Sequence, residues 1–123
     1  MEQTNSLEPP VVVAIYKIYF AFFSLSIKFP KMYRYSLAQT IEQHFHLCLQ
    51  NIFEANCLPC PLREMPLIKA NSHCELLKLL IRMTYELALI NPTQYFHLSA
   101  QLQGIGKMLG GWIKFVRSGI KNN

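Results

Sequence analysis

The residues with the greatest capacity for chemistry are four cysteines and four histidines. Cys57 and Cys60 have the two-residue separation of many zinc-binding pairs, and His73 and Cys74 would complete a set of four ligands. However, His73 and Cys74 are adjacent and would point to different sides of a helix, and free cysteines are commonly small buried hydrophobic residues. We expect no metal and no other cofactor, and this zinc site stays as the alternative.

No arrangement of residues in the sequence indicates catalysis. His44 and His46 are two positions apart and cannot share a helix face. The chain shows no paired carboxylates, no Ser/His/Asp set and no glycine-rich phosphate loop between a strand and a helix. We therefore expect a protein that is not an enzyme.

A cationic strip is the clearest candidate for binding. After Glu86 the chain contains no acidic residue, yet it contains Lys107, Lys114, Arg117 and Lys121. In a helix these four residues fall within about 80° of one another. Such a strip suits a phosphate backbone, which it would position without reading sequence, and three or four phosphate contacts are expected. The alternative is a helix end that is basic because the helix dipole favours cations there.

The elements that would position these residues are helices, because apolar residues recur at steps of three and four and no alternating strand pattern is sustained. The predicted helices cover residues of about 11–28, 36–57, 71–90 and 92–117. Ser36 and Asn91 are the expected caps of two of them. The prolines between Cys57 and Pro66 predict an irregular surface loop. The whole chain, 1–123, is expected to form one all-α domain, an antiparallel up-down four-helix bundle.

The first predicted helix is apolar enough to require a comparison with a membrane span. Residues 11–27 are fewer than the roughly 20 that a bilayer requires, and Lys17 and Ser24 mark a polar stripe opposite Tyr19 and Phe23. This pattern favours a buried bundle helix. The first ten residues contain no Lys or Arg, so we expect no secretion signal and a cytoplasmic protein.

Composition indicates a folded chain with partners. Apolar residues make up 51% of the 123 residues and charged residues 15%, which excludes disorder and suggests that a partner covers some apolar surface. A net charge of +5 favours a polyanionic or acidic partner. Glycine in a helix interior lowers helix stability, so a cluster of glycines there predicts the close approach of another backbone, of this chain or of another subunit. The glycines of the last predicted helix are Gly104, Gly106, Gly110 and Gly111.

The same helix carries a resemblance to a known family. The stretch GIGKMLGGWIK, residues 104–114, resembles the C-terminal helix signature of Avd, the accessory variability determinant of diversity-generating retroelements. KFPK at 28–31 and RYSL at 34–37 resemble the first turn of that family. The resemblance covers nearly the whole chain after Val11, but Cys74, Gly104 and the proline-rich loop depart from the family pattern.

This resemblance implies a ring-like homo-oligomer, a pentamer, of four-helix subunits. It implies binding to the retroelement's reverse transcriptase and to its template RNA or cDNA, in support of mutagenic reverse transcription. The implied contact residues are Lys31, Arg34, Lys78, Arg82, Lys107, Lys114, Arg117 and Lys121. Gly106, Gly110, Gly111 and Trp112 would be packing or subunit-contact residues. Because the wider family includes proteins encoded in ribosomal RNA intervening sequences, a stand-alone interaction protein that binds protein or host-locus RNA is the alternative.

Overall fold

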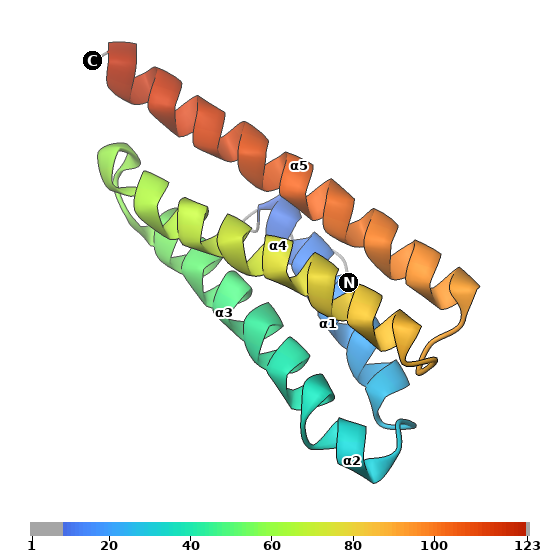
Figure 1. Cartoon of the computed structure of the whole chain (residues 1–123). Coiled ribbons are helices and arrows are strands. Elements are labelled where there is room, and N and C mark those ends of the chain that lie inside the picture. Colours follow the sequence, from blue (N-terminus) through green and yellow to red (C-terminus); the bar gives the residue numbers. More distant parts are fainter. Residues whose placement is uncertain (1–8, 123) are drawn as a thin grey trace, which may run out of the picture.

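The computed structural model describes residues 9–122, and in this range it contains helices and no strand (Figure 1). The elements are α1 Pro10–Ser26, α2 Lys31–Arg34, α3 Leu37–Cys57, the 3-10 helix η2 Cys60–Leu62, α4 Glu64–Glu86 and α5 Pro92–Asn122. The all-α prediction is confirmed, with α2 as one additional short turn.

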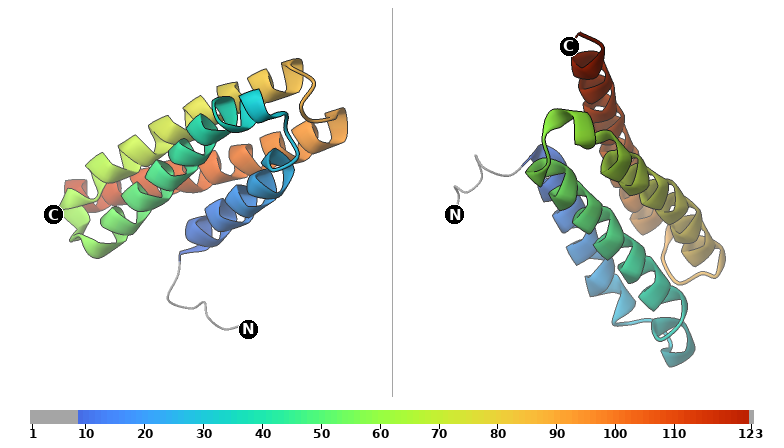
Figure 2. Two further views of the ribbon diagram at one scale, coloured as in Figure 1. Left: turned by 90° about the horizontal axis from the view of Figure 1, so that it is seen from below. Right: turned by 90° about the vertical axis from the view of Figure 1, so that its left-hand side faces the viewer.

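The four long helices form an up-down bundle in which chain neighbours are also neighbours in space. Helix α3 packs against α4, α4 packs against α5, and α1 closes the bundle against both α3 and α5 (Figures 1 and 2). At 31 residues, α5 is the longest helix, and its C-terminal part lies at the end of the bundle where η2 contacts it. One long face of α5 is therefore turned away from the other helices.

The core is built from the apolar stripes of all four long helices. Phe22 of α1, Phe45 of α3, Ile81 of α4 and Leu109 of α5 are fully buried. Some of the buried residues of α3 and α4 are small, among them Cys48, Ala70 and Cys74, and the Cys48 thiol donates a hydrogen bond to the Ala70 carbonyl at 3.4 Å. Small side chains allow these two helices to approach closely.

The largest difference from the sequence prediction is the start of α4. This helix begins at Glu64, not near residue 71, and Pro66 is buried inside its first turn. Proline is tolerated there because the first N–H groups of a helix have no carbonyl partner within the helix. The prediction of an irregular loop through Pro66 was therefore wrong, and η2 also orders part of that segment.

The helix ends differ in how they are stabilised. At the start of α5, the Asn91 side chain accepts from the Gln94 N–H and the Gln94 side chain accepts from the Asn91 N–H, both at 2.8 Å, so the predicted cap is confirmed. Ser36 provides no side-chain cap, because its hydroxyl donates instead to the Met32 carbonyl at 2.6 Å. Ala88, just after α4, has a left-handed backbone with φ of 61°.

Two apolar stripes remain exposed. The α1 stripe consists of Tyr16, Phe20, Phe23 and Ile27, and the α4 stripe consists of Leu76, Leu79 and Met83. The prediction that Phe23 is buried was wrong, since the bundle covers the adjacent face of α1. Despite this apolar content, none of the helices described is both long and apolar enough to cross a membrane.

Candidate nucleic-acid interface

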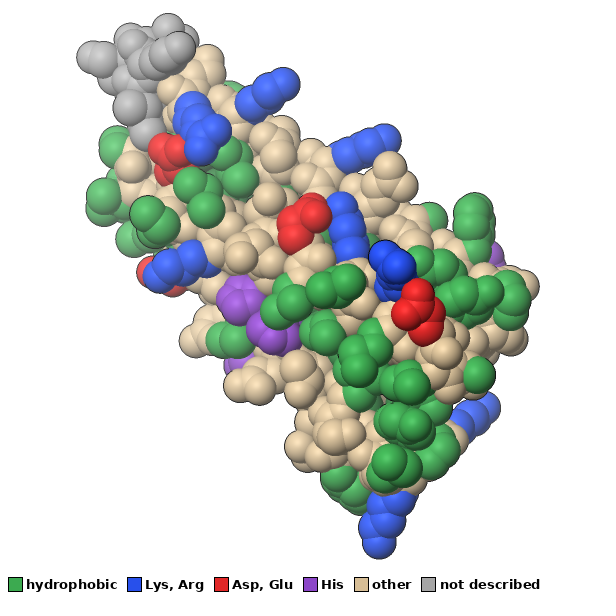
Figure 3. Space-filling view, viewed as in Figure 1, with side chains coloured by type: hydrophobic (Ala, Val, Ile, Leu, Met, Phe, Trp, Pro, Cys, Tyr) green, Lys and Arg blue, Asp and Glu red, His purple; other side chains and the backbone are tan. Residues whose placement is uncertain are grey.

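Lys107 and Lys114 are the two cations that the outer face of α5 leaves open. They are seven residues apart, which is close to two helical turns, so both project from the same side of the helix. Both are exposed, and neither takes part in an ion pair within residues 9–122. In Figure 3, blue side chains along the outer edge over α5 stand away from red ones. A polyanion could reach these two charges directly.

Arg117 lies on the same side of α5 but is not an open charge. Its Nε donates to Oε2 of Glu64, a residue of the first turn of α4. The expectation of unopposed charge along the strip was therefore wrong at Arg117, because the end of α5 passes over the start of α4. Lys121 belongs to α5, but its side chain lies outside the described residues.

Two of the three cations of α4, Lys78 and Arg82, are paired along their own helix. Lys78 Nζ lies 3.0 Å from Oε2 of Glu75, and Arg82 Nε lies 3.1 Å from Oε2 of Glu86. These spacings of three and four residues bring the partners onto one face. In Figure 3, blue and red side chains adjoin one another over α4. The α4 pairs therefore present less net positive charge than the sequence count suggests.

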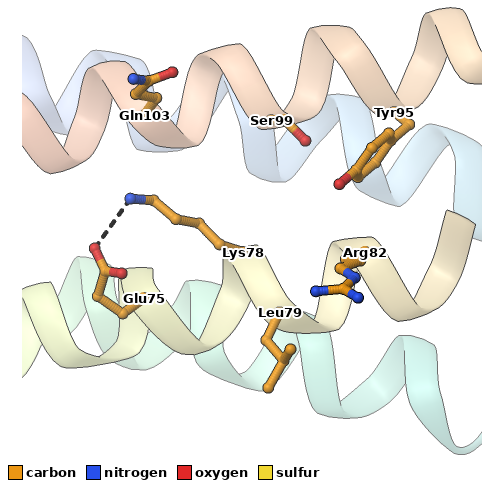
Figure 4. A pocket seen from close by; sticks show the side chains of 7 residues that line it. All are labelled: Glu75, Lys78, Leu79, Arg82, Tyr95, Ser99 and Gln103. Carbon is orange, nitrogen blue, oxygen red and sulfur yellow. Dashed lines mark hydrogen bonds and ion pairs between the residues drawn. The ribbon is translucent and has the colours of Figure 1, made fainter.

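A groove of about 470 Å³ separates these pairs from α5. It is lined by Glu75, Lys78, Leu79, Arg82, Tyr95, Ser99 and Gln103 (Figure 4). Tyr95 and Ser99 point from α5 toward α4, and the Tyr95 ring stacks on Tyr85 with centroids 4.4 Å apart. The polar residues that α5 contributes to this groove were not predicted from the sequence, although Tyr95, Ser99 and Gln103 repeat at steps of four.

Lys31 and Arg34 lie on α2, at the opposite end of the bundle from the C-terminal end of α5 (Figure 1). Lys31 is exposed. Arg34 is partly buried, its Nη1 donates to the Ile27 carbonyl at 3.4 Å, and its guanidinium lies 5.3 Å from the centre of the Tyr35 ring. Arg34 thus holds α2 against the end of α1, and the structure does not bring it together with the α5 cations.

A comparison with protein-family models shows to which family the chain belongs. The family model described as bAvd-like matches residues 12–116, which is most of the chain. The chain belongs to the bAvd-like family. No curated protein matches the sequence.

All four glycines singled out in the sequence lie on α5, inside the part of the chain matched as bAvd-like. A Cβ added at Gly104, Gly110 or Gly111 would meet nothing within 4 Å, and at Gly106 it would meet only Lys78 Nζ, at 3.6 Å. Within the described chain no backbone therefore approaches these glycines closely, and of the two expected neighbours only another subunit is left. Contact with another subunit stays a prediction.

Trp112 of this bAvd-like chain is a packing residue. It is partly buried against the core, and with Pro9, Pro10, Val11 and Met108 it lines a small cavity of about 290 Å³. The indole therefore packs α5 against the start of α1.

The alternative zinc ligands are not gathered in the bAvd-like fold. Cys74 is buried and its thiol donates to the Leu102 carbonyl at 3.6 Å, while His73 faces His44 and Cys57 is exposed at the end of α3. Burial raises the pKa of the Cys74 thiol to about 11 and that of Cys48 to about 12, so both are protonated at neutral pH. Among residues 9–122 no group of three or more such side chains could hold a metal ion.

Proposed function

We propose that the protein is a non-enzymatic accessory factor of a retroelement reverse transcriptase. In this proposal it binds the polymerase and its template RNA or cDNA in the cytoplasm and supports mutagenic reverse transcription. Family membership over residues 12–116 supports the accessory role. The observation that carries the binding surface is the pair of exposed lysines on α5, Lys107 and Lys114, which no glutamate of the described chain neutralises.

Nucleic-acid binding is tested by titrating labelled single-stranded RNA and duplex DNA with the protein at several salt concentrations. Two phosphate contacts from each engaged subunit predict that log K falls with log salt at a slope of about −1.4 for the single strand and −1.8 for the duplex. Unrelated sequences should bind with similar affinity, because phosphate contacts carry no sequence information. An affinity that does not change with salt would contradict the proposed surface.

Polymerase binding is tested by co-purification with the reverse transcriptase of the same genetic element. The wild-type protein should be recovered with the enzyme, and charge reversal of Lys107 and Lys114 should reduce that recovery. Treatment with nuclease separates a direct protein contact from one bridged by nucleic acid. If no reverse transcriptase is retained by the wild-type protein, the accessory role is wrong.

The proposal includes a homo-oligomer, with the five-fold ring implied by the family resemblance as its form. The α1 stripe and the α4 stripe are two different apolar surfaces on separate helices. A ring requires such a heterologous contact, in which one surface of a subunit meets a different surface of the next. A ring would also repeat Lys107 and Lys114 around its circumference, so weak contacts would add by avidity.

The oligomer is tested by light scattering of the wild-type protein and of Phe20→Glu. Phe20 lies in the middle of the α1 stripe, and a buried unpaired carboxylate there should dissociate the assembly. Phe96→Glu is the matched control, because Phe96 is similarly exposed on α5 outside both stripes. A wild-type particle of 14.3 kDa at micromolar concentration would exclude the oligomer.

A further inference from the structure

A pair of histidines joins α3 and α4 in a way that neither the sequence nor the family match assigns. Nδ1 of His44 lies 2.9 Å from Nδ1 of His73, and both rings are partly buried. The ring centroids are 5.1 Å apart. With the two Nδ1 atoms 2.9 Å apart, this is close to the largest centroid separation possible, which is reached when the nitrogens point straight at each other. The two nitrogens therefore face each other directly, as in a hydrogen bond. A metal ion bound by both rings would instead require the lone pairs to converge on a point beside them.

This contact constrains the protonation of the pair. A neutral imidazole donates through one ring nitrogen and accepts through the other, so one ring can donate Nδ1–H while its partner accepts at Nδ1. When only one ring is protonated, its Nδ1–H still donates to the neutral Nδ1 of the other ring, so the contact is kept. When both rings are protonated, both nitrogens become donors, and two cations face each other with no acceptor between them.

The surroundings of the pair supply little to offset that repulsion. The neighbouring charges are Glu42 and His46 on α3, and Lys69, Glu75 and Lys78 on α4. Glu42 accepts a hydrogen bond from Ser26 of α1, at 3.0 Å, and Glu75 is paired with Lys78. On the other helices in contact, the charges are Lys17 on α1 and Lys107 and Lys114 on α5, with Arg117 paired to Glu64.

Burial lowers the pKa of His73, and the neighbouring His44 lowers it further. Adjacent to the pair along both helices, Cys48 and Cys74 belong to the closely packed small-residue contact of α3 and α4. Repulsion between the rings therefore acts on the α3–α4 contact, which the Cys48–Ala70 hydrogen bond also joins.

We propose that His44 and His73 form a pH-sensitive latch, which holds α3 against α4 at neutral pH and destabilises their packing when both rings are protonated. The sign follows from linkage. The unfolded chain takes up protons at ordinary histidine pKa values near 6.5, whereas the folded chain resists the second proton. Stability contributed by the latch is complete above that pH and is lost as the pH falls through the lowered pKa of the folded pair.

The test is denaturant unfolding of the full chain from pH 8 to pH 5, with a chelator present so that metal ions cannot bridge the rings. The wild-type midpoint should fall as the pH is lowered. His44→Gln and His73→Gln each remove the second cation, so their midpoints should change much less with pH. His46→Gln is the matched control, because His46 is exposed two residues away on the same helix, and it should keep the wild-type pH dependence.

A second measurement is made first on the wild-type protein, so its main result does not depend on whether a variant folds. Histidine ring resonances of the wild-type protein, followed by NMR through the same pH range, should show the His73 ring titrating below the ordinary histidine pKa of about 6.5. His44→Gln should move the titration of His73 upward. The latch is wrong if His73 titrates at the ordinary histidine pKa in the wild-type protein, or if removing His44 leaves the pH dependence of stability unchanged.

Discussion

Helices α4 and α5 lie side by side, yet they carry their charges in opposite ways. On α4 each of Lys78 and Arg82 has a glutamate one turn away on the same helix. On α5 the lysines at 107 and 114 have no acidic residue on their own helix, because none follows Glu86 in the chain. The Lys78 and Arg82 pairs thus give a nearly neutral face on α4, whereas Lys107 and Lys114 give an open positive face on α5.

The two helices also differ in their intrinsic stability. All five glycines of the chain lie in α5, and α4 has none. Glycine in a helix interior costs up to about 1 kcal/mol relative to alanine, so α5 depends more on its packing and its N-terminal cap. The surface proposed for binding is therefore carried by the helix with the lower intrinsic helix propensity.

The largest effect is expected when the open charges of α5 are removed. Lys107→Gln combined with Lys114→Gln should weaken nucleic-acid binding by about 10- to 100-fold at 0.1 M salt and flatten the salt slope by about 1.4 for a single strand and about 1.8 for a duplex. Fluorescence anisotropy with a labelled oligonucleotide measures both quantities. The lysines are exposed, so circular dichroism and the melting temperature should remain close to the wild-type values.

The matched control is Lys78→Gln combined with Arg82→Gln, which changes the net charge by the same amount. Because Glu75 and Glu86 already neutralise these cations, the loss of affinity should be less than about fivefold. Equal losses for the two double variants would show that net charge alone governs binding, and the difference between the helices would then have no functional meaning.

A smaller effect, in the opposite direction, is expected when the α4 cations are released from their partners. Glu75→Gln combined with Glu86→Gln leaves Lys78 and Arg82 free beside the groove. Affinity for nucleic acid should rise by about three- to tenfold, with a steeper salt slope, if the bound strand passes over the groove. An unchanged affinity would confine the contact to the outer face of α5.

Whether a feature can be predicted from the sequence depends on how far apart along the chain its interacting residues lie. The α4 ion pairs follow from local spacing, and the cap of α5 follows from Asn91 and Gln94 three residues apart. The start of α4 was missed because proline density suggested a loop, whereas position in the first turn decides whether proline is tolerated. Local rules were sufficient for the α4 ion pairs and the α5 cap, but not for Ser36, whose hydroxyl donates to the Met32 carbonyl instead of capping α3.

Contacts between distant segments were not available to the sequence analysis. Glu64 and Arg117 are 53 positions apart, and His44 and His73 are 29 apart, so only the packing of the bundle brings each pair together. The prediction that Phe23 of α1 is buried was wrong for a related reason. The segment is apolar around most of its circumference, and its periodicity does not define which face the other helices cover.

The glycines of α5 give a test of whether its outer face meets another subunit. Gly110→Ala and Gly111→Ala should each raise the free energy of unfolding by about 0.5–1 kcal/mol, because an added Cβ meets nothing within 4 Å. Thermal unfolding measures this gain, and light scattering reports the assembly. A stable helix with a smaller particle would place the glycines at a subunit contact, whereas an unchanged particle would exclude that role.

The smallest effect concerns the Arg117–Glu64 ion pair, which links α5 to α4. Arg117→Gln should lower the free energy of unfolding by less than about 1 kcal/mol, because the Arg117 side chain is 57% exposed and surface ion pairs contribute little. Glu64→Gln should cost more than Arg117→Gln, since the carboxylate also interacts favourably with the N-terminus of α4. It should at the same time free Arg117 and steepen the salt slope of binding by about 1. If Glu64→Gln leaves that slope unchanged, Arg117 is not part of the binding face, and the contact is restricted to the two lysines.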